Sequence, residues 1–426
     1  MTKPFLRLVI GSLVAAATSA APALGQSLAN RIASTSDRSV QFSYPVRPGV
    51  CGDGRTYIST GSGNFYGSFS TNGAEQCLAG PVRVVADLAD RNVIALRTYV
   101  GGPAAAAAES GVTNLGVVTS AEAADYLVGV AARADGRVGR DAIFAALLGE
   151  NVNLTSRLID IGRDQNRPLE TRRAALSGLV RSDSRQLDKI GSTLVQIATN
   201  ESDVQGVRTS ALSTLSRLDH GAGIQPLVQL AGANLTSWVG RQAMTVLARS
   251  GDPRARQFLR ATAQRTDLPD EVQAVALRGL GREYVTGQDA VLLRSIYPRL
   301  TGQRSQDAVL ASIAELGGAD NVQWLVGRVR DDKLTPDARR RALQYLTRAG
   351  ATIPSLLSLY DPITDRQVRE SLIGVYSRLA DKAATEKLVW IARNEQDPAL
   401  KRRAISALSR DSDPTIRQAL QDIVER

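Results

Sequence analysis

From about residue 120 to the C-terminus, apolar residues follow a helical period inside a longer repeat of about 33 residues. In each repeat a small residue, usually Ala, is followed directly by a large aliphatic residue and, three positions later, by another apolar residue. These small residues, here called anchor residues, are Ala142, Ala175, Ala211, Ala243, Ala276, Val309, Ala342, Ser371 and Ala404. Because a small side chain on a buried face lets the next helix approach closely, each anchor residue predicts one amphipathic helix.

A second helix is expected after each anchor residue. Its apolar marker commonly falls 16 positions later, at Leu227, Leu259, Leu292 and Leu325. Short breakers at 251–253, 317–320 and 411–414 are expected to separate the two helices of a unit. No single hairpin can bury its apolar stripe alone, so the units must stack. The pattern predicts a mainly α fold, a right-handed α-solenoid of about nine helical-hairpin repeats over 120–426.

The preceding segment, 26–102, alternates apolar and polar residues with a period of two and is predicted to be β-rich. Short strands are expected at 40–44, 56–58 and 64–69, and a hairpin is expected to join 82–86 to 93–100 through the turn-forming residues 90–92. Residues 103–119 are predicted to be a linker or the start of a helix. The two cysteines of the chain, Cys51 and Cys77, both lie in the β-rich segment and are predicted to form a disulfide.

The segment 1–25 has the three-part layout of a secretory signal peptide: Lys3 and Arg7, then an apolar run, then small residues at 20–25. Cleavage is expected after Ala23 or Gly25. The alternative is a membrane-spanning segment, but polar residues interrupt the apolar run, which is short for a span of about 20 residues. We therefore expect an exported protein, periplasmic or secreted, with no transmembrane anchor after cleavage.

The charge balance is basic, with 52 Lys and Arg against 42 Asp and Glu. Removal of the signal peptide takes away two cations and no acid, so the net charge falls from +10 to +8. An excess of this sign can attract an anionic partner, and in an exported protein an envelope polymer or an acidic protein is a more natural partner than nucleic acid. Solvated arginines on helix faces are the simpler explanation.

The first helix of several units carries the pattern Arg-x-x-Ala-Leu-x-x-Leu, as in 172–179, 208–215 and 339–346. Together with the repeat period and the Asp, Pro and Gly turns, this pattern resembles HEAT-like repeats, in particular the short variety found in phycobilisome-lyase-type proteins. The resemblance covers about 120–426. It implies a protein-binding scaffold in most members and an enzyme in a minority.

In such repeats an Asp near the start of a hairpin often pairs with an Arg of the first helix. The resemblance therefore implies pairing of Asp203 with Arg208 and of Asp337 with Arg339. The alternative for these arginines is a ligand-binding basic stripe.

No residue constellation supports a specific chemistry, and we expect no catalytic, cofactor-binding or metal-binding site. His220 is the only histidine and lies in a predicted turn beside Gly221, without a recognisable catalytic partner motif. Two cysteines and one distant histidine are too few ligands for a zinc site. The three tryptophans lie inside predicted helices, and aromatic residues make up only 4% of the chain, so a stacking platform for nucleic acid is not expected.

The second helices of stacked hairpins commonly line the concave face, where partners bind. Polar residues flank the apolar markers there and form the predicted partner site: Gln225, Gln229, Arg256, Arg260, Arg294, Gln323, Arg328, Glu386 and Arg393. The simpler alternative is that these side chains are only solvated. We expect a non-enzymatic exported scaffold that binds a protein partner in this groove. The alternatives are binding of an anionic envelope polymer and a lyase-like or enzyme-associated factor.

Overall fold

The protein is described by a computed structural model that covers residues 26–55, 57–60, 65–66, 77–101, 111–134, 136–181, 184–282, 286–409, 416–418 and 420–421. These residues belong to two compact units, Met1–Ser182 and Asp183–Arg426, here called unit 1 and unit 2. The predicted signal peptide lies outside the described residues, and so does 103–110 of the predicted linker.

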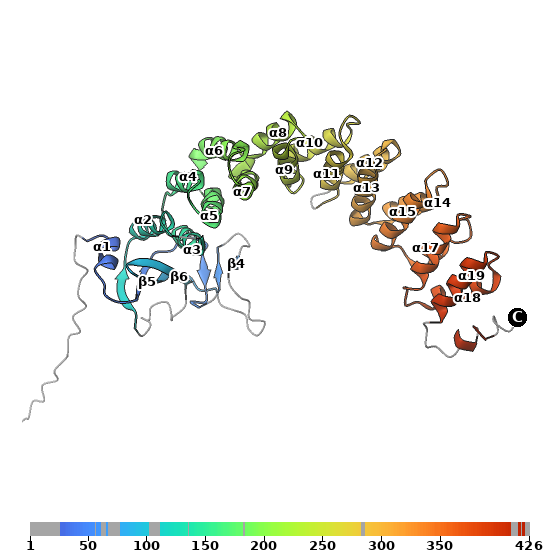
Figure 1. Cartoon of the computed structure of the whole chain (residues 1–426), viewed down its shortest axis with the longest axis horizontal. Coiled ribbons are helices and arrows are strands. Elements are labelled where there is room, and N and C mark those ends of the chain that lie inside the picture. The colour runs from blue at the N-terminus through green and yellow to red at the C-terminus, as the bar shows by residue number, and fades with distance from the viewer. Residues whose placement is uncertain are drawn as a thin grey trace, which may run out of the picture. The chain divides into compact units, whose positions relative to one another are not determined.

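Unit 1 combines β-strands with the first helices of the repeat (Figure 1). Its strands are β1 (Ser39–Tyr44), β2 (Cys51–Gly52), β3 (Ile58–Ser59), β4 (Phe65–Tyr66), β5 (Val82–Ala89), β6 (Asn92–Val100) and β7 (Thr113–Val117). Its helices are α1 (Leu28–Ala33), α2 (Ser120–Ala131), α3 (Gly136–Ala146), α4 (Thr155–Arg163) and α5 (Leu169–Gly178), and a 3-10 turn follows at Leu179–Arg181. One sheet has the order β6-β5-β1-β7, in which only β7 runs parallel to its neighbour.

The predicted hairpin is confirmed, because β5 and β6 pair in antiparallel fashion from Val82–Val100 to Ala89–Asn92. Its turn places Asp90 and Arg91 at φ values of 47° and 63°, in the left-handed region. Two consecutive residues with positive φ give a turn whose twist matches that of the strands. Asp tolerates this conformation better than most residues, which is why the sequence could mark the turn.

The four-stranded sheet packs directly on α2 and α3. Phe42 and Tyr44 of β1 are fully buried, and the ring of Phe42 meets that of Tyr126 in α2 edge to face, with centroids 6.0 Å apart. The hydroxyl of Tyr44 donates a 2.7 Å hydrogen bond to the carbonyl of Ala145 in α3. Burial raises the pKa of Tyr44 well above its ordinary value. The sheet therefore shares its core with the first helical hairpin.

The predicted disulfide is confirmed, since Cys51 and Cys77 are bonded with their Cα atoms 5.1 Å apart. Strand β2, which begins at Cys51, pairs with β3, and β3 pairs with β4. Residues 113–117 differ from the linker predicted there, because they form β7 along the edge of β1. The predicted boundary near residue 119 also differs from the division of the chain, because unit 1 holds α2–α5 as well as the sheet.

Unit 2 consists of helices. They are α6 (Leu187–Thr199), α7 (Gln205–Leu215), α8 (Ile224–Ala233), α9 (Trp238–Leu247), α10 (Pro253–Ala263), α11 (Asp270–Leu280), α12 (Gly287–Ile296), α13 (Gln303–Leu316), α14 (Ala319–Arg330), α15 (Pro336–Arg348), α16 (Ile353–Leu357), α17 (Arg366–Tyr376), α18 (Lys382–Asn394) and α19 (Pro398–Leu408). Short 3-10 turns lie at Ser184–Gln186, Asp219–Gly221 and Tyr297–Arg299. The predicted mainly α fold with a small β-rich N-terminal part is confirmed.

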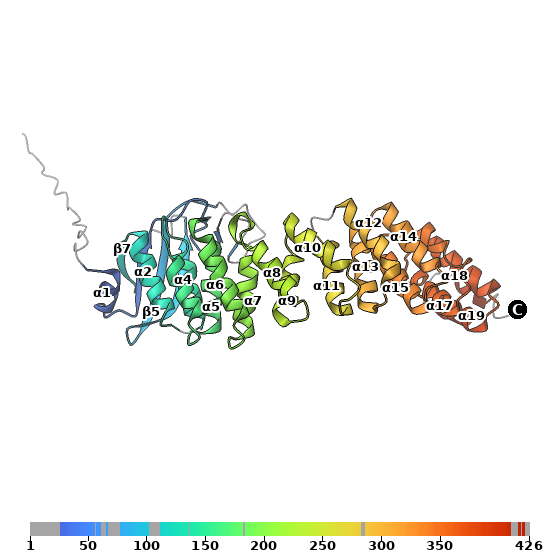
Figure 2. The ribbon, with the colours of Figure 1, turned by 90° about the horizontal axis from the view of Figure 1, so that it is seen from above.

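The nine anchor residues fall on nine helices, α3, α5, α7, α9, α11, α13, α15, α17 and α19, here called anchor helices. In unit 2 each anchor helix contacts the next one, so α7 to α19 form one row, and α6 to α18, here called marker helices, form the other (Figures 1 and 2). All anchor residues except Ser371 are completely buried. The prediction that these small side chains let neighbouring helices approach is confirmed.

The pairing of helices within a hairpin is shifted by half a repeat from the predicted one. In unit 2 the marker helices α8, α10, α12, α14 and α18 each pack more extensively on the anchor helix that follows them than on the one that precedes them. The hairpins are therefore α8–α9, α10–α11 and so on, and the anchor helix is the second helix of its hairpin. The predicted breakers at 251–253 and 317–320 lie between hairpins, not inside them.

The register of α17 also differs from the predicted one by a single position. Ser371 is partly exposed, whereas Leu372 and Ile373 are fully buried and take the places of the anchor residue and its aliphatic neighbour. With Leu372 as the anchor position, the short step that follows Ala342 moves closer to the common repeat period. The sequence pattern selected Ser371 as the anchor residue because its side chain is small, like those of the Ala residues in the other units.

The residue three positions before the anchor position ties neighbouring helices together. In α15 the Nε of Arg339 donates a 2.8 Å hydrogen bond to the carbonyl of Val329, near the end of α14. Equivalent bonds to the end of the preceding segment are made by Arg172, Arg208, Gln273, Gln306 and Arg369. A carbonyl in the last turn of a helix has no partner in its own helix, so these side chains satisfy it.

This bond corrects the predicted pairing of Asp337 with Arg339, because Asp337 pairs instead with Arg340, one turn along the same helix. Arg208 likewise donates to the carbonyl of Ala198, and its guanidinium lies 4.3 Å from the ring centroid of Trp238 in the next anchor helix. The pairing of Asp203 with Arg208 stays a prediction. Ion pairs between repeats include Glu271–Arg304, Asp307–Arg341 and Glu370–Arg403.

We expect Arg339→Gln to keep the stability of the α14–α15 hairpin within about 0.5 kcal/mol, because Gln273 already makes the same bond in α11. Arg339→Leu is expected to cost about 2 kcal/mol, since it leaves the buried carbonyl of Val329 without this donor. Native-state hydrogen exchange of the α14 and α15 amides measures both values. Equal losses in the two variants would show that the charge or length of Arg339, not its hydrogen bond, matters.

Candidate functional site

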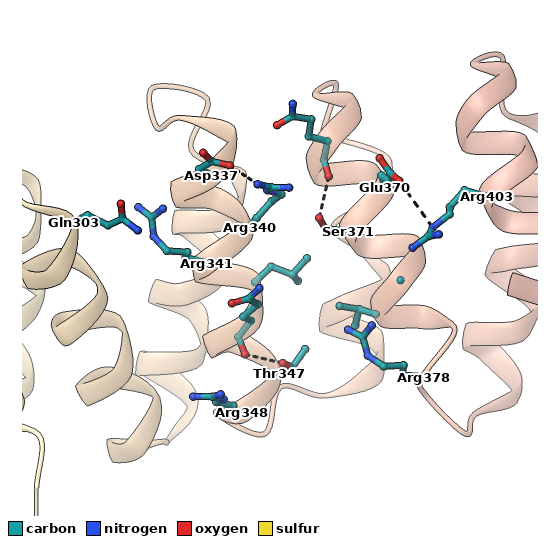
Figure 3. Close-up of a pocket in the computed structure, with 15 residues that line it drawn as sticks. Gln303, Asp337, Arg340, Arg341, Thr347, Arg348, Glu370, Ser371, Arg378 and Arg403 are labelled. Atoms are coloured by element: carbon teal, nitrogen blue, oxygen red, sulfur yellow. Dashed lines mark hydrogen bonds and ion pairs between the residues drawn. The ribbon is translucent and has the colours of Figure 1, made fainter.

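A groove with a volume of about 820 Å³ lies on the anchor helices α13, α15, α17 and α19 of unit 2 (Figure 3). Its side chains come mainly from α15 and α17, where residues three or four apart share one helix face. On α15 these are Arg340, Gln344, Thr347 and Arg348, and on α17 they are Gln367, Glu370, Ser371 and Gly374. Arg378 lies in the turn directly after α17. The groove exists because the opposite faces of these helices hold the buried anchor positions.

Several charged side chains of the groove are paired with one another. Asp337 and Arg340 form an ion pair within α15. Arg341 is 2.7 Å from Asp307 of α13, and Arg403 of α19 is 4.0 Å from Glu370 of α17. The last two pairs join successive anchor helices, and the three together neutralise most of the charge along one side of the groove.

Two arginines of the groove are not neutralised in this way. Arg348 and Arg378 are exposed, and among the described residues no carboxylate oxygen lies within 4.0 Å of either guanidinium. Arg348 contacts the ring of Tyr345 at 5.6 Å from its centroid, on its own helix. Figure 3 places Arg348 and Arg378 toward the same end of the groove, away from the Asp337–Arg340 pair. This end is suited to a negatively charged group.

The residues predicted to bind a partner lie on the other row of helices. Gln225 and Gln229 are on α8, Arg256 and Arg260 on α10, Arg294 on α12, Gln323 and Arg328 on α14, and Glu386 and Arg393 on α18. None of them lines the groove of α13–α19. The sequence pattern did not indicate the groove, because the anchor helices were expected at the first position of each hairpin. The sequence feature that indicates the groove is the series of polar residues, three or four positions apart, within 340–348 and 367–378.

Arg256 and Arg260 have a structural role, because both hold a buried carboxylate of α12. The side chain of Asp289 is completely buried and accepts 2.7 Å hydrogen bonds from Arg256 Nη2 and Arg260 Nε. It also accepts 3.0 Å bonds from the backbone N–H and the hydroxyl of Thr286 at the start of α12. Burial alone raises the pKa of Asp289, but the hydrogen bonds from Arg260, Thr286 and Arg256 outweigh it and lower the pKa to about 2.

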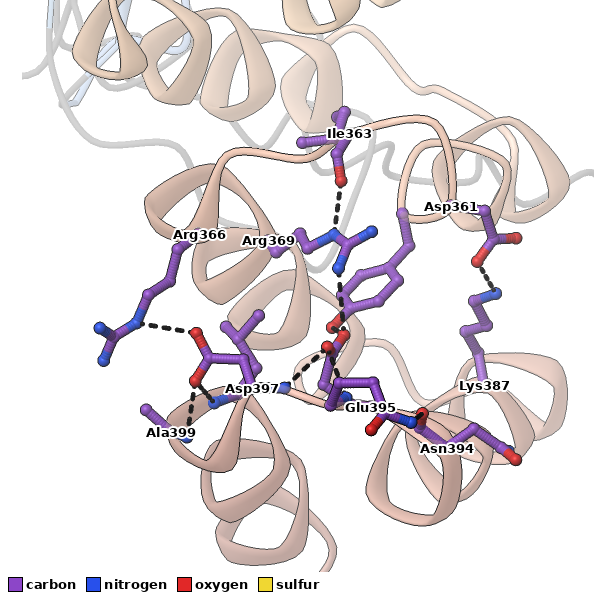
Figure 4. A network of polar contacts seen from close by, with 12 residues as sticks. Asp361, Ile363, Arg366, Arg369, Lys387, Asn394, Glu395, Asp397 and Ala399 are labelled. Atoms are coloured by element: carbon purple, nitrogen blue, oxygen red, sulfur yellow. Dashed lines mark hydrogen bonds and ion pairs between the residues drawn. The ribbon is translucent and has the colours of Figure 1, made fainter.

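A second polar network joins the turn after α16 to the turn between α18 and α19 (Figure 4). The hydroxyl of Tyr360 donates a 2.7 Å hydrogen bond to Glu395, whose carboxylate also lies 3.3 Å from Arg369. Burial raises the pKa of Glu395, but the bonds from Tyr360 and from backbone N–H groups lower it below the ordinary range. Nearby, Lys387 lies 2.7 Å from Asp361. Because the charged groups are paired internally, this network fixes two hairpins together.

Other candidates from the sequence also have a defined place. His220 is exposed in the 3-10 turn Asp219–Gly221, with a φ of 56°. Among the described residues there is no group of three His, Cys, Asp or Glu side chains arranged to hold a metal ion. In the same part of the chain no helix is both long and apolar enough to cross a membrane.

Comparison with known proteins gives no matching family model, and no curated protein matches either. Solved structures do match. One is human deoxyhypusine hydroxylase in complex with glycerol, with 17% identity over 57% of this chain and 97% of that chain, at a TM-score of 0.28. Another is a TOG domain array of microtubule polymerases from work on tubulin recruitment, with 11% identity over 71% of this chain and 91% of that chain, at a TM-score of 0.24.

A third match is a computationally designed self-assembling cyclic homooligomer, with 16% identity and a TM-score of 0.12 over 72% of this chain and 92% of that chain. At these TM-scores the likeness carries no argument about function. The fold is a helical repeat. Its nine anchor helices recur with one sequence period, and those of unit 2 contact one another in succession.

Proposed function

We propose that this chain is an exported, non-enzymatic scaffold that binds a protein partner in the groove of α13, α15, α17 and α19. The observation that carries the proposal is the groove itself, which crosses four successive helices of one row. Neighbouring packed helices are about 8–10 Å apart, so the groove is roughly 25–30 Å long. That length matches about eight residues of an extended chain.

The chemistry of the groove supports a polypeptide partner. Gln344 and Gln367 are exposed and offer both donors and acceptors, as the backbone of an extended segment requires. The Asp307–Arg341 ion pair joins α13 to α15 before any partner binds, so less conformational freedom is lost on binding. The second candidate is an anionic envelope polymer, which Arg348 and Arg378 favour because neither is paired with a described carboxylate.

Site-specific photo-crosslinking tests the proposal and separates the groove from the face predicted by sequence. A photoreactive amino acid is placed at Gln344 or Gln367 in the groove, and in control proteins at Gln323 of α14 or Glu386 of α18. In the source organism we expect a discrete cross-linked protein from the groove positions and none from the controls. Cross-links from the control positions alone would contradict the proposal, and so would the absence of any cross-linked protein from all four.

A further inference from the structure

Among the described residues of unit 2, five arginines occupy one register position, six residues after the anchor position of their helix. They are Arg217, Arg249, Arg282, Arg348 and Arg378, at or just after the C-terminal ends of α7, α9, α11, α15 and α17, and they are here called the arginine stripe. Arg410 holds the same position after Ala404 in the sequence and lies outside the described residues. The corrected register of α17, with Leu372 at the anchor position, places Arg378 in this set. Because the anchor helices contact one another in succession, with their C-terminal ends at one edge of the row, the five side chains form a line.

Basic residues at helix C-termini often serve the helix alone, by bonding to its last carbonyls. In the part of the chain that the structure describes, only Arg217 of these five makes such a bond within its helix, from Nε to the carbonyl of Ser213 at 3.2 Å. All five arginines are exposed, and within the described ranges none is within ion-pair distance of a carboxylate. Their guanidinium groups are therefore available to a partner.

The stripe has one interruption. In α13 the residue six positions after Val309 is Glu315, which is also exposed. Over the described positions from α7 to α17, the order is thus three positive positions, one negative position and two positive positions. A uniformly charged polyanion would be repelled at Glu315, whereas a polypeptide can place a basic residue there.

The geometry points to an extended acidic segment of a partner protein, bound along the arginine stripe in a fixed register; this inference rests on the proposed function. Neighbouring helices are about 8–10 Å apart and an extended strand advances about 3.3 Å per residue, so one repeat corresponds to about three residues of the ligand. The ligand has an acidic residue at every third position, with a basic residue opposite Glu315. Its last two acidic positions lie at Arg348 and Arg378, at the end of the groove.

The experiment measures binding of two fluorescent peptides to the full chain at low ionic strength by anisotropy. The matched peptide has six charged positions three residues apart, in the order Asp, Asp, Asp, Lys, Asp, Asp, with Ser and Thr between them. The uniform peptide has Asp at all six positions. We expect the wild-type chain to bind the matched peptide about fivefold more tightly, and Glu315→Lys to reverse this preference. An unchanged preference in Glu315→Lys would overturn the register.

The matched control for charge uses the marker helices. Arg348→Gln combined with Arg378→Gln is expected to weaken binding of the matched peptide about tenfold. Arg294→Gln combined with Arg393→Gln changes the net charge equally but acts on the other row, and it is expected to change affinity less than twofold. Equal losses in the two double variants would show unspecific attraction and overturn the inference.

A third arm uses inorganic polyphosphate as the probe. If polyphosphate binds more tightly than the matched peptide, and binding is lost in the Arg348 and Arg378 double variant, the stripe binds a polyanion and the peptide inference is wrong. The proposed function has a separate readout in the photo-crosslinks from Gln344 and Gln367. If these cross-links persist in the double variant while the peptides do not bind, the groove still binds a protein but the stripe does not select it.

Discussion

Replacing Asp289 by Asn is expected to lower the free energy of local unfolding of α10–α13 by about 3 kcal/mol. The carboxylate is completely buried and holds Arg256, Arg260 and the first turn of α12 together. Its removal leaves two guanidinium groups facing each other at a poorly solvated site, which is the costly way to break a buried ion pair. Native-state hydrogen exchange of the α10–α13 amides measures the change, with roughly a hundredfold faster exchange expected.

The matched control is Asp267→Asn, which also removes one carboxylate from an arginine, Arg265. Asp267 is 65% exposed, so this change is expected to cost less than about 0.5 kcal/mol. The pH dependence gives a second check. The pKa of Asp289 is lowered to about 2 in the folded chain, so its stabilising effect is complete above about pH 4 and is lost as the pH falls toward 2. A variant with the same acid sensitivity as wild type in α10–α13 would contradict this role.

Removing the disulfide, with Cys51→Ser and Cys77→Ser together, is expected to destabilise the β-rich part of unit 1, including the β6-β5-β1-β7 sheet, by about 3 kcal/mol. The bond closes a loop with a sequence separation of 26, and its loss lets the unfolded segment explore many more conformations. Faster hydrogen exchange is expected in β1, β5 and β6. The amides of α13–α19 serve as an internal control and should be unchanged. Uniform acceleration throughout the chain would contradict a local role for the bond.

The helical repeat could be predicted because burial has a simple sequence signal. Ala211, Ala243 and Ala276 recur with one period, and each is completely buried on an anchor helix. The β5–β6 hairpin was predictable for a similar reason, since Asp90, which adopts the left-handed conformation in this turn, is one of the few residue types that tolerate it. In both cases the local structure, a buried helix face or a tight turn, depends on residues close together in the sequence.

Helix pairing could not be predicted in the same way. The apolar stripe of a helix shows which face is buried but not whether the preceding or the following helix covers it. The sequence pattern therefore placed α8 and α9 in different hairpins, and the predicted partner site falls on the marker helices, not on the row that carries the groove. Arg256 was misread for a related reason, because its partner Asp289 lies a full repeat further along the chain and meets it only when α10 and α12 come together.

The candidate site was partly visible in the sequence. Arg348 and Arg249 share a register position that can be counted from the anchor residues, but Arg378 falls out of step if Ser371 is taken as the anchor. The burial of Leu372 resolves this. Which arginines are neutralised could not be foreseen, since Arg341 finds Asp307 on another helix only in the folded chain.

The most direct test of the central claim, that partners bind on the row of anchor helices, is hydrogen exchange of the full chain with and without the matched acidic peptide. We predict protection at the C-terminal turns of α15 and α17, around Arg348 and Arg378, with no change in α14 and α18. Protection of α14 and α18 instead, with α15 and α17 unchanged, would contradict the claim and return the binding face to the marker helices.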